Sequence, residues 1–159
     1  MIALIDYKAG NLTSVKKALA TVGADLYVPA APEDLADAAG IVVPGVGHFG
    51  ATRALDAPWI DAILARIGEG RPLLGICLGM QWLFEGSDEA PDVAGLGLLS
   101  GRCYRLGTVR LKPDATYDVR GIRLQPDLAV KIPHVGWNSL TIERGDASIL
   151  EGVAPGSQV

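Results

Sequence analysis

Residues 75–81 read Gly-Ile-Cys-Leu-Gly-Met-Gln, and the rest of the sequence is arranged around this stretch. The apolar residues 72–76 predict a short buried strand, and residues 78–85 have helical composition. A cysteine between two glycines at a strand-to-helix turn is typical of a nucleophile elbow, where a sharp backbone turn lifts the reactive side chain clear of the sheet. The start of a helix also favours the thiolate. We therefore predict that Cys77 is a nucleophile; the alternative is an inert cysteine buried among small residues.

The composition narrows the class of protein. A chain of 159 residues with 49% hydrophobic and 20% charged residues predicts one globular domain. Its net charge of −4 and 6% aromatic content argue against nucleic acid or an anionic membrane as a partner. Two distant cysteines indicate neither a disulfide framework nor a zinc site, and we expect no metal and no cofactor. The longest nearly apolar run, residues 73–84, is too short to span a bilayer, and the start does not resemble a signal peptide, so we expect a soluble, cytoplasmic protein.

Strands and helices alternate in the first half of the chain. The expected strands span residues 2–5, 25–28, 41–43 and 72–76, and helices are expected to begin at residues 12, 32, 58 and 78. This alternation predicts an open, mainly parallel α/β sheet with helices on both faces. Chemistry in such a sheet gathers at the carboxyl ends of the strands. Glycine-bearing loops follow three of the strands, so we expect these loops to share one rim.

Local signals predict the helix ends. Asn11 is a suitable N-cap for a helix over residues 12–22, and Gly23 is a suitable end for it. Pro58 favours the first turn of a helix that reaches Gly68.

The pattern changes after residue 86. A glycine-rich loop is expected over residues 91–99 and a strand over residues 102–106. Residues 116–124 alternate in a way that predicts an antiparallel strand, and residues 139–142 read as a further strand. We therefore expect an antiparallel addition in the C-terminal half.

The glycine loops suggest how an oxyanion would be stabilised. Attack of a thiolate on an acyl carbon creates an oxyanion that needs preorganised N–H donors. The N–H of Leu78 comes with the elbow, and the N–H of Val46, between two glycines, could supply a second donor; a plain turn is the alternative for residues 44–47. Gln81 lies one helical turn after Cys77 and could bond an amide substrate, although a solvated helix residue is an equally good interpretation.

A general base is harder to find. A cysteine nucleophile is usually paired with a histidine that a carboxylate or amide orients. The chain has two histidines, His48 and His134, and neither is followed by an obvious orienting carboxylate. Neither is favoured as the base.

Four motifs together carry a family resemblance. They are Asp-Tyr-x-x-Gly-Asn at residues 6–11, Pro-Gly-Val-Gly-His-Phe at 44–49, the elbow at 75–81 and Pro-His-x-Gly-Trp-Asn at 133–138. In this order they resemble a class I, triad-type glutamine amidotransferase domain of the flavodoxin-like type, and within that class the glutaminase subunits of imidazole glycerol phosphate synthase, an enzyme of histidine biosynthesis. The elbow is shared by the class, whereas the first and last motifs are specific to this subunit. Lys8 stands where glycine is common.

The resemblance implies a reaction. Cys77 would attack the side-chain amide of glutamine, release ammonia and leave a glutamyl thioester that water hydrolyses. Gly47 and Gln81 would help to hold glutamine, and the N–H groups of Val46 and Leu78 would form the oxyanion hole.

The resemblance also implies a partner. A (β/α)₈-barrel cyclase subunit would take up the ammonia to form imidazole glycerol phosphate. Tyr7, Gly10, Asn11 and Trp137 would map to the docking face. Docking has a physical reason, because ammonia released into water is mostly protonated and no longer nucleophilic.

In this family the base histidine and its glutamate lie later than residue 159, so residues 1–159 by themselves are expected to be inactive. Two interpretations stay open: a glutaminase subunit, and a degenerate, catalytically inactive binding module of the same fold. A cysteine hydrolase of a related elbow-bearing fold is a weaker third, because the two subunit-specific motifs argue against it.

Overall fold

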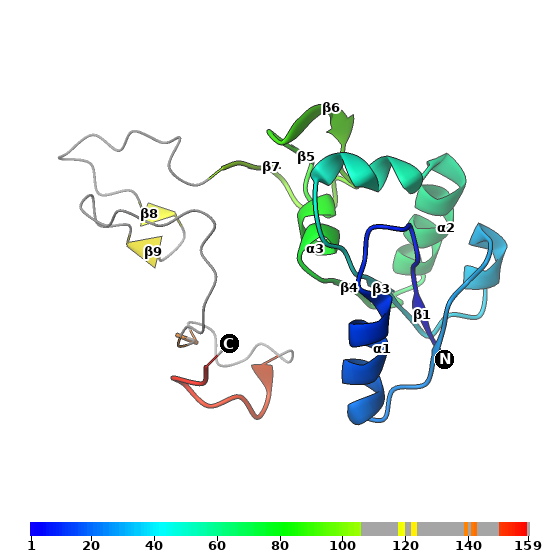
Figure 1. Cartoon of the computed structure of the whole chain (residues 1–159), viewed down its shortest axis with the longest axis horizontal. Helices are drawn as coiled ribbons and strands as arrows, with labels where there is room; N and C mark the ends of the chain where they lie inside the picture. Colours follow the sequence, from blue (N-terminus) through cyan, green and yellow to red (C-terminus); the bar gives the residue numbers. More distant parts are fainter. Residues whose placement is uncertain (106–117, 120–121, 124–138, 140, 143–149, 159) are drawn as a thin grey trace. The chain divides into compact units, whose positions relative to one another are not determined.

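The structure of the chain is a computed structural model that describes residues 1–105, 118–119, 122–123, 139, 141–142 and 150–158 (Figure 1). It divides into two compact units, Met1–Arg105 and Leu106–Val159. The expectation of a single domain stays a prediction. Among the described residues, no helix is both long enough and apolar enough to cross a membrane.

A four-stranded parallel sheet forms the centre of the first unit, with the strand order β2-β1-β3-β4. Its strands are β1 (Ile2–Leu4), β2 (Leu26–Tyr27), β3 (Gly40–Val43) and β4 (Leu73–Gly75). Ile2 pairs with Leu26 on one side and with Gly40 on the other. The predicted parallel sheet is confirmed, and its order is that of flavodoxin-like folds.

The connections between the strands explain where a site would form. Helix α1 (Leu12–Thr21) joins β1 to β2, and helix α2 (Ala57–Gly68) joins β3 to β4. These two connections run in opposite directions across the sheet, so right-handed crossovers place α1 and α2 on opposite faces. The direction reverses between the carboxyl ends of β1 and β3, which is where ligands bind in open α/β sheets.

The helix ends follow from local chemistry. The Asn11 side chain accepts a hydrogen bond from the Ser14 N–H at 3.2 Å, which confirms the predicted N-cap. Gly23 follows the helix with φ of 78°, the left-handed conformation that glycine adopts without strain. The N-cap of α2 is Asp56, whose carboxylate accepts from the Trp59 N–H at 3.4 Å. Between β2 and β3 lies a short 3₁₀ helix, η1 (Pro32–Leu35).

Large apolar side chains from the strands and from the helices after them meet in one core. It includes Ile5, Leu35, Ile41, Val43, Phe49, Ile63, Leu78 and Trp82, all nearly or fully buried. Phe49 begins η2 (Phe49–Ala54), a 3₁₀ helix that was not predicted from the sequence.

Helix α3 (Leu78–Trp82) is shorter than the helix predicted over residues 78–85. The backbone of residues 95–99 takes over the carbonyls that a longer helix would use: Leu96 N–H donates to the Trp82 carbonyl at 2.6 Å, and Leu99 N–H to the Leu83 carbonyl at 2.9 Å. A Cβ on Gly95 would lie 1.9 Å from the Phe84 carbonyl oxygen. Tertiary hydrogen bonds therefore end the helix early.

The loop predicted over residues 91–99 is partly wrong, because strand β6 (Ala90–Ala94) occupies its first half. It pairs antiparallel with β5 (Gly86–Ser87), which pairs parallel with β7 (Arg102–Cys103). The pairing is driven by burial, since Ala90 and Val93 join the core beside Phe49.

In the second unit, β8 (Asp118–Val119) pairs antiparallel with β9 (Ile122–Arg123). The single strand predicted over residues 116–124 is therefore two short ones, because an alternating pattern does not show where a chain turns back. Ser139 forms an isolated antiparallel bridge with Gln158, and of the strand expected over residues 139–142 the described residues 141 and 142 are not in a strand. The predicted antiparallel addition is confirmed by β5–β6 and by β8–β9. The motif at residues 133–138 lies outside the described residues.

Candidate active site

Cys77 lies at the turn between β4 and α3, with φ of 54° and ψ of −109°. For a residue other than glycine this backbone conformation is strained. Strained residues of this kind persist where the surrounding fold holds them in place, and they are common at functional sites. The residue is exposed. The predicted sharp strand-to-helix turn is therefore present at Cys77, and its cysteine is exposed, whereas the role of Cys77 as a nucleophile stays a prediction.

The two glycines of the elbow are needed because backbone approaches backbone. A Cβ on Gly79 would lie 1.8 Å from the Val43 carbonyl oxygen, at the end of β3. A Cβ on Gly75 would lie 2.7 Å from the Gly79 carbonyl oxygen and from the backbone of Met80. Helix α3 thus packs directly against the ends of β3 and β4, and this contact determines the position of Cys77.

The loop after β3 brings the second expected oxyanion donor to the same rim. The Val46 N–H donates to the carbonyl of Ala9, in the loop after β1, at 2.5 Å. Gly47 follows with φ of 101°. The N–H of Leu78 heads helix α3, and no described residue accepts from it. In this state one of the two N–H groups is open and the other is engaged by Ala9.

His48 and Gln81 also lie in the first unit. His48 is exposed, and its Nδ1 accepts the Gly50 N–H at 3.0 Å, which caps η2. Gln81 is half-buried, and its N–H donates to the Cys77 carbonyl at 3.0 Å, one turn along the helix. His134 and Trp137 fall outside the described residues.

The loop after β1 explains the unusual Lys8. Its φ is 62°, a left-handed conformation that favours glycine. Asp6 accepts from the Lys8 N–H at 3.0 Å and from Nζ at 2.7 Å. The hydrogen bond from the Lys8 side chain, followed by that from its backbone, lowers the pKa of Asp6. A lysine thus adopts a backbone conformation that favours glycine, and its ion pair with Asp6 helps to hold it there.

Three of the four residues expected at the docking face lie among the described residues, and they differ in exposure. Asn11 is exposed and Gly10 is half-buried, whereas Tyr7 is only 5% exposed and belongs to the core. Burial, and next the nearby negative charge of the Cys77 thiolate, raises the pKa of Tyr7 to about 12. Tyr7 therefore lies beneath the surface, on the side of Cys77.

Sequence reasoning missed Glu89, in the turn between β5 and β6. Its Oε2 accepts the Phe49 N–H at 2.7 Å and so holds the first residue of η2. The Ser87 hydroxyl in turn accepts the Glu89 N–H at 3.2 Å. The acidic pair Asp88-Glu89 after the elbow helix was the available signal, but a pair of charges by itself usually indicates a solvated turn.

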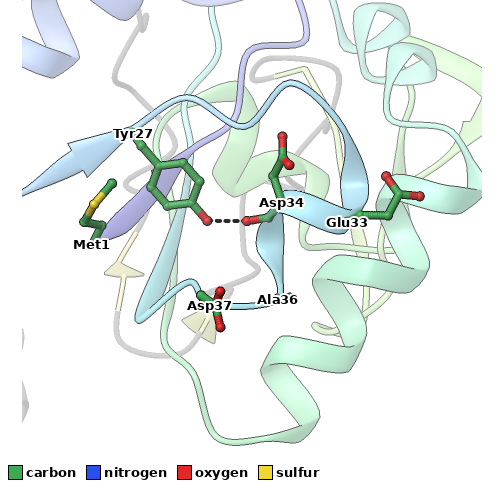
Figure 2. A pocket seen from close by; sticks show the side chains of 6 residues that line it. All are labelled: Met1, Tyr27, Glu33, Asp34, Ala36 and Asp37. Atoms are coloured by element: carbon green, nitrogen blue, oxygen red, sulfur yellow. Dashed lines mark hydrogen bonds between the residues drawn. The ribbon is translucent and has the colours of Figure 1, made fainter.

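A shallow hollow elsewhere in the first unit is not part of this site. Figure 2 shows its lining, which includes Met1, Tyr27, Asp34 and Asp37. Tyr27 belongs to β2, at the opposite edge of the sheet from β4 and Cys77. Its hydroxyl donates to the Asp34 carbonyl at 2.7 Å. Among the described residues, His, Cys, Asp and Glu side chains form no group that could hold a metal ion.

The two cysteines are expected to differ in reactivity. Cys77 is exposed, whereas Cys103 is half-buried in β7, and burial raises the pKa of the Cys103 thiol. A raised pKa leaves less thiolate at a given pH. Alkylation at mildly acidic pH followed by peptide mapping should therefore label Cys77 first. Faster labelling of Cys103 would contradict the assignment of Cys77 as the reactive thiol.

Comparison with known proteins agrees with this geometry. The family model "Glutamine amidotransferase class-I" matches residues 3–157. The chain is similar to "Imidazole glycerol phosphate synthase subunit HisH" of Bacillus subtilis, with 46% identity over 89% of this chain and 61% of the relative. The same subunit of Pyrococcus furiosus is 40% identical over 98% of this chain and 66% of the relative. The chain thus spans roughly three-fifths to two-thirds of the length of these curated relatives.

A solved structure supports the fold. "Crystal structure of glutamine amidotransferase" superimposes with a TM-score of 0.58 and 23% sequence identity, over 69% of this chain and 59% of that one. At this identity the likeness concerns the fold alone. The family model, which matches nearly the whole chain, shows more: the chain belongs to the class-I glutamine amidotransferase family.

Proposed function

We propose that the chain provides the glutaminase part of an imidazole glycerol phosphate synthase and hydrolyses glutamine to glutamate and ammonia. The observation that carries the proposal is the exposed Cys77 on a strained strand-to-helix turn. It occurs in a chain that is 46% identical to such a subunit. The four sequence motifs, which include the two subunit-specific ones, support the same assignment.

In the proposed reaction, the Cys77 sulfur attacks the side-chain amide carbon of glutamine, and the carbonyl oxygen takes the negative charge. The carbon–nitrogen bond then breaks, the nitrogen gains a proton and leaves as ammonia, and a glutamyl thioester remains. Water attacks the thioester, which gives glutamate and restores the thiol. Gly47 and Gln81 are the proposed glutamine contacts on either side of Cys77.

The oxyanion hole requires a backbone change. Leu78 N–H is in position from the elbow and has no acceptor among the described residues. The N–H of Val46 is bonded to the Ala9 carbonyl at 2.5 Å and can serve only after that bond breaks. We propose that the structure represents a resting state in which one donor is held back.

The test is glutamate formation from glutamine by the natural chain in complex with its cyclase subunit. Cys77→Ala should abolish turnover, because no other described thiol lies on the elbow. Cys103→Ala is the matched control and should retain it. Turnover that survives Cys77→Ala would refute the proposal. A complex that forms normally but never hydrolyses glutamine would identify the degenerate binding module instead.

We further propose docking on a (β/α)₈-barrel cyclase subunit through Gly10, Asn11 and Trp137, with buried Tyr7 supporting that surface from beneath. Loss of a buried aromatic anchor commonly costs about 2 kcal/mol or more at an interface. Titration calorimetry should therefore show weaker binding for Trp137→Ala and Asn11→Ala. Cys77→Ala should bind as the unmodified chain does, and equal affinity of all three variants would place the interface elsewhere.

A further inference from the structure

Tyr7 is only 5% exposed, and its hydroxyl is buried. This hydroxyl has no hydrogen-bond partner among the described residues. An unpaired buried hydroxyl is costly, because the group has lost its hydrogen bonds to water and gained none in return. Such a group calls for a specific explanation. Phenylalanine would fill the same space in the core without this cost.

The hydroxyl lies where three segments of the site converge. A Cβ built on Gly45 would meet the Tyr7 oxygen at 2.1 Å, the Leu78 Cβ at 2.7 Å and the Gly79 nitrogen at 3.2 Å. The absence of a side chain at Gly45 therefore makes room for the hydroxyl. Tyr7 follows β1 and Gly45 follows β3, so the contact lies at the carboxyl ends where the strand order reverses.

The backbone change proposed for Val46 creates a need for a donor next to Gly45, the residue that the Tyr7 hydroxyl approaches. The peptide between Gly45 and Val46 is planar, and its N–H and C=O point in opposite directions. When the Val46 N–H turns away from the Ala9 carbonyl, the Gly45 carbonyl of the same peptide turns toward Ala9. Ala9 presents a carbonyl there and offers no proton. The carbonyl would be left unpaired or would face another carbonyl.

We propose that Tyr7 is a positioning residue whose hydroxyl donates to the Gly45 carbonyl after the Gly45–Val46 peptide has turned its N–H toward the oxyanion. The hydroxyl thus has no partner among the described residues at rest and gains one in the reacting state. The pairing lowers the energy of the reacting state relative to the resting state. This inference rests on the proposed glutaminase function and assigns a role to the tyrosine of the first sequence motif.

The substitution that isolates the hydroxyl is Tyr7→Phe, in the natural chain bound to its cyclase subunit. The kcat for glutamine hydrolysis should fall about tenfold, which corresponds to about 1.4 kcal/mol. The KM should stay unchanged, because the bond forms only when the oxyanion hole forms. The melting temperature should stay equal or rise, since the variant removes a buried hydroxyl that no described residue pairs with.

Tyr27→Phe is the matched control. Its hydroxyl is paired with the Asp34 carbonyl at 2.7 Å, on the far edge of the sheet. This variant should melt at a lower temperature and keep the unmodified kcat. The two tyrosines should therefore respond in opposite ways in stability and in turnover.

Each other outcome has a defined meaning. An unmodified kcat for Tyr7→Phe overturns the inference while leaving the glutaminase function intact. A lower melting temperature for Tyr7→Phe, or a KM that rises in proportion to the loss of kcat/KM, also overturns it, because the hydroxyl would then be structural or would bind substrate. Absence of Cys77-dependent turnover in the unmodified complex refutes the proposed function itself.

Discussion

Residues 1–159 mixed with a cyclase subunit are expected to hydrolyse glutamine about 10²–10⁴-fold more slowly than a chain that also carries the family's later histidine and glutamate. The leaving nitrogen needs a proton and the thioester needs an activated water, and a positioned histidine supplies both. The histidine among the described residues is His48, and we do not expect it to act in this way, because its Nδ1 already accepts the Gly50 N–H at 3.0 Å as the cap of η2.

The comparison is made with the two chain lengths at equal concentrations of partner and substrate. Cys77→Ala in both lengths gives the background rate. His48→Ala in the shorter chain tests whether this residue contributes to any residual rate. Equal, Cys77-dependent turnover by both lengths would contradict the expectation, and a loss of that turnover in His48→Ala would then make His48 the base.

Replacement of Gly79 by alanine is expected to destabilise the first unit by about 3 kcal/mol, the upper end of the usual cost of overpacking. The new Cβ would lie 1.8 Å from the Val43 carbonyl oxygen, which is backbone on a central strand and has no side-chain rotamer to change. A loss of this size is a large part of the stability of an ordinary domain, about 5–15 kcal/mol. Urea denaturation followed by circular dichroism measures it.

Gly68→Ala is the matched control. Gly68 ends α2, and an added Cβ there would meet no atom within 4 Å. Alanine in a helix is favoured over glycine by up to about 1 kcal/mol, so this variant should be neutral or more stable. Equal urea midpoints for Gly68→Ala and Gly79→Ala would show that α3 can move away from β3 at little cost.

The sequence predicted the parts of the fold that depend on local chemistry. The apolar runs predicted all four strands of the parallel sheet, and Asn11 predicted the start of α1, because runs of apolar residues and helix capping are read within a few residues. The burial expected for the strand over residues 72–76 was wrong, because β4 has no buried residue and Leu74 is 38% exposed. The elbow at Cys77 was also visible, since its glycine–cysteine–glycine spacing is a local pattern, although the reason for Gly79 is the close contact with Val43 of β3.

The missed features depend on contacts between distant residues. Helix α3 ends early because residues 95–99 bind its carbonyls, and β6 forms because Val93 reaches the core beside Phe49. The bond of Val46 to Ala9 and that of Phe49 to Glu89 join loops far apart in the chain. Periodicity and capping rules carry no information on such pairs. The burial of Tyr7 belongs to the same class.

The backbone conformation of Cys77 has a consequence for attempts to engineer the protein. Glycine adopts φ of 54° and ψ of −109° with less strain than cysteine does, so Cys77→Gly is expected to relieve strain. A selection that rewards resistance to heat alone would therefore favour loss of the nucleophile. A selection from variant libraries of this chain therefore needs a growth or activity requirement in addition to the thermal one. Otherwise the most heat-resistant variants will be ones that have lost the reactive thiol.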